Sequence, residues 1–202
     1  MTMKRLLLLV LLAAFPGAAA MALEEPQYEV LLRKNDIEFR RYEPYLVAEV
    51  TVRGDNQAFR ILAGYIFGDN VEQEKMQMTA PVERRDRDHA FVMESKYSMD
   101  TLPTPNDQRI RLHERPARVV AVREFSGRWS ERNFAKHEKA LLDGIASLGV
   151  EATGAPELAR YNSPFTLWFL RRNEIIVPVN WTSADAVQTH GEHIATETAA
   201  RL

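Results

Sequence analysis

The chain has 202 residues, enough for one domain with a sizeable hydrophobic core. Its formal net charge of −2 lacks the positive excess that nucleic-acid-binding proteins carry. Cysteine is absent, which excludes disulfides, a lipid-anchored cysteine and covalent haem attachment through a Cys-x-x-Cys-His motif.

The first 22 residues have the pattern of a secretory signal peptide. Two basic residues precede an apolar run over residues 6–15, and the small residues that follow offer cleavage after Ala20 or Ala22. The run is far shorter than the roughly 20 apolar residues that span a bilayer, so an uncleaved tether is the lesser alternative. We therefore expect a signal peptide at 1–22 and an exported protein, with the bacterial periplasm favoured over a eukaryotic secretory route.

Three runs with alternating apolar and polar residues open the mature chain, at residues 28–33, 37–40 and 46–52. This alternation is typical of antiparallel strands that turn one face inward.

A short helix is predicted after Gly54. Four apolar residues follow one helical stripe: Phe59, Leu62, Ala63 and Ile66. Three more lie off this stripe: Ile61, Tyr65 and Phe67. The surplus apolar surface leaves two interpretations open. Either a strongly curved sheet buries the helix on two sides, or one side of the helix lines a hydrophobic ligand groove.

Beyond the helix, the pattern predicts a strand over 76–82, an exposed polar hairpin tip over 83–88 and a returning strand over 90–93. The proline-rich stretch 102–107 fits neither a helix nor a central strand, and it is predicted to separate two halves of the domain.

The second half repeats the first. When Val47-Ala48 is set against Val120-Ala121, Gly54 falls on Gly127 without a gap, and a helix over about 129–148 follows. One strand–glycine–helix unit used twice indicates an internal duplication. Two apolar strands are predicted at 167–170 and 175–179, and the polar tail 182–202 is predicted to be disordered.

Several motifs occur in one order along the chain: Tyr65-Ile66-Phe67-Gly68, Met78-Thr79-Ala80-Pro81-Val82, Leu102-Pro103-x-Pro105, Phe125-Ser126-Gly127, Tyr161-x-x-Pro164 and Arg171-Arg172-Asn173-Glu174. This ordered set resembles the SOUL haem-binding protein family over about residues 28–181. The resemblance implies an α+β fold, a distorted antiparallel β-barrel of two pseudo-repeated β-rich halves, each with a packed helix. It assigns residues 23–181 to one SOUL-type domain.

The resemblance also implies non-covalent binding of haem or a related tetrapyrrole in a hydrophobic groove between the first helix and the Tyr-x-x-Pro loop. Carried over by motif, the groove residues are Phe59, Ala63, Phe67, Tyr161 and Phe165. Candidate partners for the haem propionates are Arg60, Arg171 and Arg172. For each arginine alone, a surface role is the default.

The position that supplies an axial iron ligand in part of the family is occupied by a different residue here. Some members have histidine before the tyrosine that ends the second strand, where this chain has Arg41, which cannot ligate iron. His89 and His113 are expected to be exposed, and His137 on the second helix is a weak candidate ligand. Tyr161 is expected to form a hydrogen bond rather than bind iron. We therefore predict haem bound without a dedicated protein ligand and no other metal site.

No esterase elbow, phosphate loop or zinc-protease motif occurs in the sequence, so an enzyme is not predicted. The principal hypothesis is a tetrapyrrole carrier or buffer outside the cytoplasm, without nucleic acid or a stable membrane span. The alternatives are a haem-dependent enzyme, either a peroxidase or a haem-degrading one, and a binding module for other hydrophobic small molecules. The hypothesis of a general binding module remains open because the duplicated unit resembles bacterial multidrug-effector-binding domains.

Overall fold

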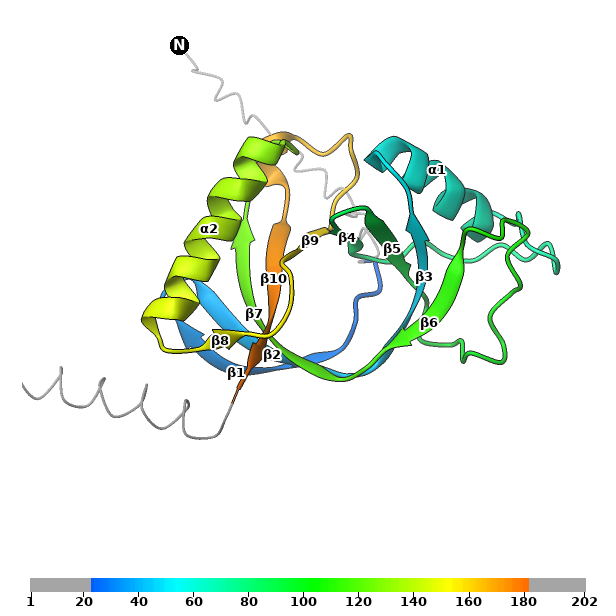
Figure 1. Cartoon of the computed structure of the whole chain (residues 1–202). Coiled ribbons are helices and arrows are strands. Elements are labelled where there is room, and N and C mark those ends of the chain that lie inside the picture. Colours follow the sequence, from blue (N-terminus) through cyan, green and yellow to red (C-terminus); the bar gives the residue numbers. More distant parts are fainter. Residues whose placement is uncertain (1–22, 182–202) are drawn as a thin grey trace, which may run out of the picture.

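The computed structural model describes residues 23–181 (Figure 1). The predicted signal peptide and C-terminal tail lie outside these residues. The elements in chain order are β1 (Tyr28–Lys34), β2 (Ile37–Tyr42), β3 (Tyr45–Thr51), α1 (Asp55–Ile66), β4 (Val82–Arg85), β5 (Asp88–Val92), β6 (Arg111–Arg115), β7 (Arg118–Phe125), α2 (Glu131–Ser147), β8 (Glu151–Ala152), β9 (Glu157–Arg160), the 3₁₀ helix η1 (Trp168–Leu170) and β10 (Asn173–Asn180). None of the helices in this part of the chain is long and apolar enough to cross a membrane.

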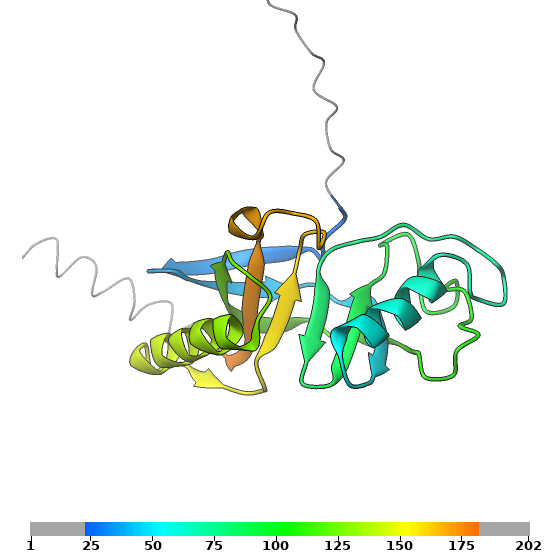
Figure 2. The same ribbon diagram turned by 90° about the horizontal axis from the view of Figure 1, so that it is seen from above.

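All strands belong to one curled, ten-stranded antiparallel sheet in the order β1-β2-β7-β10-β9-β4-β5-β3-β6, with β8 paired to β10. Both helices lie on the same face of this half-barrel (Figure 2). The register shows why. One row of successive cross-strand partners lies on a single face of the sheet: Val50, His89, Arg84 and Leu158. Val50 packs in the core under α1 and Leu158 in the core under α2.

The predicted duplication is visible in the topology. The units β3-α1-β4-β5 and β7-α2-β9-β10 meet where β4 pairs with β9 in the middle of the sheet. The strand before each unit pairs with the other unit, since β2 joins β7 and β6 joins β3. Because each half completes the sheet of the other, the two halves form one domain. The predicted fold class is confirmed.

Gly54 and Gly127, which the sequence repeat aligns, both form the turn from strand to helix. Their φ angles are 91° and 129°, in the region that disfavours other residues. At Gly127 an added Cβ would lie 2.7 Å from the side-chain nitrogen of Asn133. The repeat therefore preserves a backbone conformation as well as a pattern of letters.

The inner face of α1 differs from the predicted stripe. Its buried residues are Ala58, Leu62, Ala63, Tyr65 and Ile66. Tyr65, expected off the stripe, donates a hydrogen bond of 2.7 Å to the carbonyl oxygen of Pro103. The proline-rich segment thus covers part of the surplus apolar surface. Phe59 on α1 is 44% exposed, and Phe67, directly after the last residue of α1, is 58% exposed, so both aromatic rings keep apolar surface in contact with solvent.

The predicted strand over 76–82 is wrong, because β4 begins only at Val82. Pro81 has no N–H for a ladder, and the segment is held by separate hydrogen bonds. Met76 N–H donates to Ile66 O, and the Thr79 hydroxyl donates to Val92 O.

The exposed hairpin tip over 83–88 is also partly wrong. Glu83 and, just beyond the tip, His89 are buried, because β4 and β5 lie in the middle of the sheet rather than at its edge. Only the turn at Asp86-Arg87 is exposed.

The predicted strand over 167–170 is a 3₁₀ helix instead. Its hydrogen bond is local, from Leu170 N–H to Leu167 O at 2.9 Å, and no neighbouring strand pairs with it among the described residues. The second predicted helix begins at Glu131, where the Ser130 side chain accepts a hydrogen bond from Asn133 N–H.

Candidate ligand groove

A groove lies between the first turn of α1, the segment before α2 and the loop after β9. Its cavity is about 360 Å³, within the size range of small-molecule sites. It is lined by Asp55, Asn56, Phe59, Val82, Trp129, Arg160, Asn162 and Pro164. The lining therefore combines aromatic and apolar walls with one buried arginine.

Of the residues predicted from the sequence, only Phe59 lines this groove. Phe59 forms part of its wall and packs edge-on against Phe91, with ring centroids 5.5 Å apart. Phe165 follows the lining residue Pro164 and is exposed. Ala63, Phe67 and Arg60 do not line it. The groove lies at the N-terminal turn of α1, whereas Phe67 follows the last turn.

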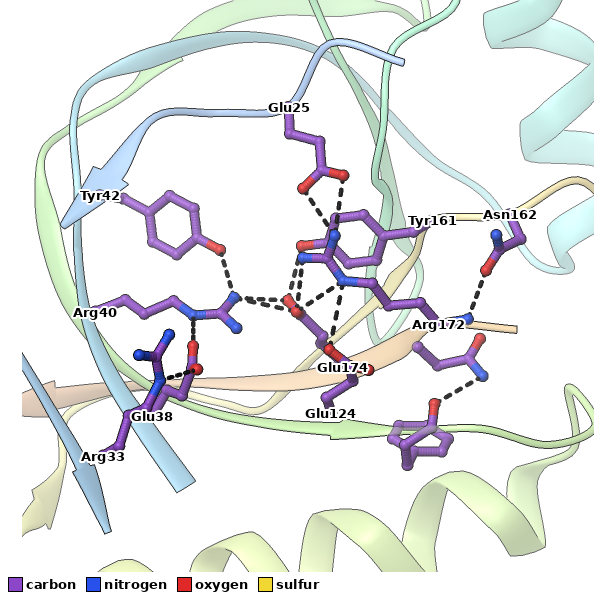
Figure 3. Close-up of polar contacts among 12 residues, drawn as sticks. Glu25, Arg33, Glu38, Arg40, Tyr42, Glu124, Tyr161, Asn162, Arg172 and Glu174 are labelled. Atoms are coloured by element: carbon purple, nitrogen blue, oxygen red, sulfur yellow. Dashed lines mark hydrogen bonds and ion pairs between the residues drawn. The ribbon is translucent and has the colours of Figure 1, made fainter. Parts of the chain in front are cut away.

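Tyr161 and Arg172 lie apart from the groove, in a buried polar network (Figure 3). Tyr161 is 8% exposed, and its hydroxyl donates to Glu174 Oε2 at 2.7 Å. The guanidinium of Arg172 lies 3.7 Å from the centre of the Tyr161 ring and pairs with Glu25 and Glu174. Both side chains are therefore already fully engaged.

Burial, followed by the Glu174 carboxylate, raises the pKa of Tyr161 well above its ordinary value. The phenol consequently stays protonated near neutral pH and acts as a hydrogen-bond donor. This state does not suit iron ligation, which tyrosine performs as the tyrosinate.

Four titratable side chains cluster where the first turns of the two helices approach each other, and two of them, Asp55 and Arg160, line the groove. Arg160 Nη1 lies 2.6 Å from Asp55 Oδ2, and Arg84 Nη1 lies 3.5 Å from Asp55 Oδ1. Arg84 also pairs with Glu131 at 2.8 Å, which links the first residues of α1 and α2. Burial alone would raise the pKa of Asp55, but the two arginines outweigh it and hold the pKa below its usual value. The carboxylate is therefore charged, and it orients Arg160.

Trp129 forms the wall opposite α1. Its indole nitrogen donates to Asn173 Oδ1 at 2.7 Å, and guanidiniums of Arg160 and Arg171 lie 5.1 and 4.3 Å from its ring centre. Arg171 in turn donates to the carbonyl oxygens of Thr166 and Pro164. The predicted propionate partner Arg171 therefore braces the loop, while Arg160, which the sequence reasoning missed, presents its guanidinium to the groove.

The signals for the missed residues are visible in retrospect. Trp129 stands two residues after the repeated Gly127, and Asn162 lies inside the Tyr-x-x-Pro motif. Nothing local distinguishes Arg160, since charged residues on strands are ordinarily solvated. Its role depends on Asp55, which is 105 residues away in the sequence.

The groove lining holds no histidine. His137 lies on α2 with its ring stacked on Phe125 at 4.2 Å, so it packs against the core. No group of three or more metal-ligating side chains occurs in residues 23–181. The residues present fit the apolar ring and the carboxylates of a tetrapyrrole, and they offer no axial ligand from the groove wall.

A larger cavity of about 520 Å³ lies elsewhere, between the N-terminal segment and the loop after β5. Its lining contains five glutamates and no lysine or arginine: Glu24, Glu25, Glu43, Glu94 and Glu114. Arg172 pairs with Glu25 and Lys96 pairs with Glu94, but the lining as a whole remains acidic and is unfavourable for a dianionic porphyrin. Size alone would favour this cavity, but charge favours the smaller groove.

The burial of His89, next to Asp55, leads us to expect that the stability of the protein depends on pH. Its Nε2 lies 3.5 Å from Asp55 Oδ1, and both ring nitrogens are buried without a hydrogen-bond partner. Burial lowers the pKa of His89, and Asp55 only partly opposes this. The unfolded chain, with a histidine pKa of about 6.5, therefore binds more protons than the folded chain as pH falls below that value. The free energy of unfolding therefore decreases as the pH falls below about 6.5.

The measurement is the free energy of unfolding by urea at pH 7 and pH 5. We expect His89→Gln to lose less stability over this interval than the wild-type chain, and Lys34→Gln, at a half-buried position on β1, to leave the difference unchanged. Equal losses for His89→Gln and wild type would show that His89 is not the group responsible.

Together these features define a class: a duplicated antiparallel half-barrel with an apolar groove at the junction of its halves. The SOUL heme-binding protein family profile matches residues 23–178. The chain therefore belongs to the SOUL haem-binding protein family, as its motifs indicated. No curated protein sequence matches it.

Solved structures resemble the chain in fold. The crystal structure of the EcmrR C-terminal domain gives a TM-score of 0.55 at 11% identity, covering 77% of this chain and 99% of that chain. An uncharacterized conserved protein from Listeria innocua gives 0.55 at 11% identity, covering 73% and 93%. A hydrolase from Listeria innocua gives 0.51 at 10% identity, covering 74% and 94%. At these identities the likeness concerns the fold alone.

Proposed function

We propose that this protein binds haem or a related tetrapyrrole non-covalently in the groove between α1 and the loop after β9, as a carrier or buffer. Family membership supports haem as the ligand class. The observation that carries the site is the groove lining itself, which places Phe59 and Trp129 beside the guanidinium of Arg160.

Each lining group has a matching part of the ligand. The exposed face of Phe59 and the ring of Trp129 take apolar macrocycle surface out of water, worth about 25 cal/mol per Å². Among the described residues, the only side-chain hydrogen bond of Arg160 goes to Asp55 through Nη1. Its other N–H groups are the donors for a propionate. Iron, when bound, supplies the redox and ligand-exchange chemistry.

The compartment is part of the proposal. The basic start and apolar run of residues 1–22 support export, with the periplasm as the destination. Because the chain has no cysteine, disulfides contribute nothing to its stability in that compartment. The three apolar clusters and the buried ion pairs within residues 23–181 provide this stability instead.

Titration of haemin into the chain beginning at Leu23, followed by absorbance, tests the proposal. We expect saturable binding of one haemin per chain, with a spectrum that lacks two strong protein ligands and is unchanged by His137→Ala. A sharp six-coordinate spectrum that His137→Ala abolishes would contradict the absence of a dedicated ligand. Absence of saturable binding would contradict the function.

The enzymatic alternative makes a different prediction. A haem-dependent peroxidase or haem-degrading enzyme would bleach the haem spectrum with peroxide or a reductant faster than free haemin. A general hydrophobic binder would release haemin to unrelated apolar dyes. A carrier does neither at comparable concentrations.

A further inference from the structure

The loop between β9 and β10 exposes an apolar surface that the groove does not use. Residues 165–170 are called the hydrophobic loop below. Five of its large side chains are between 47% and 95% exposed: Phe165, Leu167, Trp168, Phe169 and Leu170. Figure 2 shows the orange coil of η1 standing at the margin of the sheet. Single exposed apolar residues are ordinary, but a contiguous group marks a docking surface.

The hydrophobic loop is a built structure. Arg171 fastens it from within by donating to Thr166 O at 2.9 Å and to Pro164 O at 2.7 Å. Gly127 N–H donates to Trp168 O at 3.0 Å, which ties the loop to the start of the α2 segment. Since these bonds satisfy the carbonyl oxygens of Pro164, Thr166 and Trp168, the loop can enter an apolar medium at a smaller cost.

Arginines adjoin the hydrophobic loop, and the acidic residues beside it, Glu25, Glu124 and Glu174, all face one of them, Arg172. Residues 161–173 contain two arginines and no acidic residue. The guanidinium of Arg128 lies 5.8 Å from the centre of the Trp168 ring. Tryptophan with adjacent arginine is typical of side chains at a membrane interface, where the ring lies at headgroup level and the cation meets lipid phosphates.

The chain also enters the domain beside this loop. Arg172, two residues past η1, pairs with Glu25 at 2.9 Å. The junction with residues 1–22, which contain the apolar run 6–15, therefore lies next to the hydrophobic loop.

We propose that the hydrophobic loop docks the protein on the interface of an anionic lipid bilayer. The apolar side chains of η1 and Phe165 enter the acyl boundary, and Arg128 pairs with headgroup phosphates. A protein partner fits less well, because the loop protrudes and its carbonyl oxygens at Thr166, Leu167 and Trp168 already accept hydrogen bonds, whereas protein interfaces exchange about one hydrogen bond per 100–200 Å².

Sedimentation with large vesicles tests this without any haem, so its outcome is independent of the proposed function. The chain beginning at Leu23, which contains all three apolar clusters, is mixed with phosphatidylcholine vesicles, with or without phosphatidylglycerol. We expect binding to the anionic vesicles. Trp168→Ser with Phe169→Ser lowers the partition coefficient at least about tenfold. Arg128→Gln lowers it about fivefold on anionic vesicles only.

The matched control is Val71→Ser with Met99→Ser, two exposed apolar residues outside the loop, which leaves binding unchanged. Phe165→Ser provides a second variant at the most exposed position, should the double variant lose its folded circular dichroism spectrum. The proposal is overturned if the wild-type chain stays in the supernatant with anionic vesicles, or if neither loop variant weakens binding. It is equally overturned if ultracentrifugation shows that the loop joins two copies of the chain instead.

Discussion

Replacing Glu174 with alanine is expected to lower the free energy of unfolding by about 3–5 kcal/mol, the cost of removing one partner from a buried ion pair. Glu174 is fully buried on β10. Its carboxylate lies 3.0 Å from Arg40 Nη1, 2.9 Å from Arg172 Nη2 and 2.7 Å from the Tyr161 hydroxyl (Figure 3). Alanine would leave a buried guanidinium on β2 without its main counter-charge.

Urea unfolding monitored by circular dichroism measures the effect. Glu29→Ala is the matched control, because its ion pair with Arg41 is just as short, at 2.8 Å, but exposed on both sides. It should cost less than about 1 kcal/mol. Glu174→Gln keeps the shape and an acceptor oxygen. Its loss in free energy of unfolding should lie between those of Glu174→Ala and Glu29→Ala. A loss for Glu174→Ala no larger than that for Glu29→Ala would show that the network does not hold β2, β9 and β10 together.

Removing the aromatic walls of the groove should have the largest effect on ligand binding. Phe59→Ala is expected to weaken haemin binding about tenfold, because a half-exposed ring loses part of the 1.5–3 kcal/mol that burial of an aromatic side chain provides. Combining it with Trp129→Ala should weaken binding about a hundredfold. Absorbance titration with haemin measures both, and an unchanged melting temperature for Phe59→Ala shows that the fold is intact.

Phe67→Ala is the informative control for this series. Family motifs suggest Phe67 as a groove residue, whereas the structure places it past the last turn of α1, outside the lining. We expect a change of less than about threefold. If Phe67→Ala weakens binding as much as Phe59→Ala, the ligand lies further along α1 than the groove described above.

The order of strands and helices could be predicted largely because duplication leaves a local record. Gly54 and Gly127 need positive φ angles at equivalent turns, and alternation of apolar residues identifies β2 and β3 without any partner. Errors arose where charge suggested exposure. Glu83 reads as part of a polar hairpin tip, yet it lies between β5 and β9, where Arg115 Nε is 2.9 Å from its carboxylate.

The candidate site could be predicted only in part for a related reason. The motif located the loop correctly, but it could not show which way each side chain turns. Tyr161 and Arg160 are neighbours on the chain and lie on opposite faces of the sheet, one bonded to Glu174 and the other to Asp55. Contacts between residues more than a hundred positions apart, such as Arg160 with Asp55, have no local signature in a single sequence.

The most direct test of the central claim is an amide NMR spectrum of the chain from Leu23 with and without haemin, whose paramagnetic iron broadens nearby signals. We expect selective broadening for Asn56, Phe59 and Asn162 around the groove, with Glu43 and Ser98 at the acidic cavity unaffected. Broadening centred on the acidic cavity, or spread without preference over the surface, would contradict it.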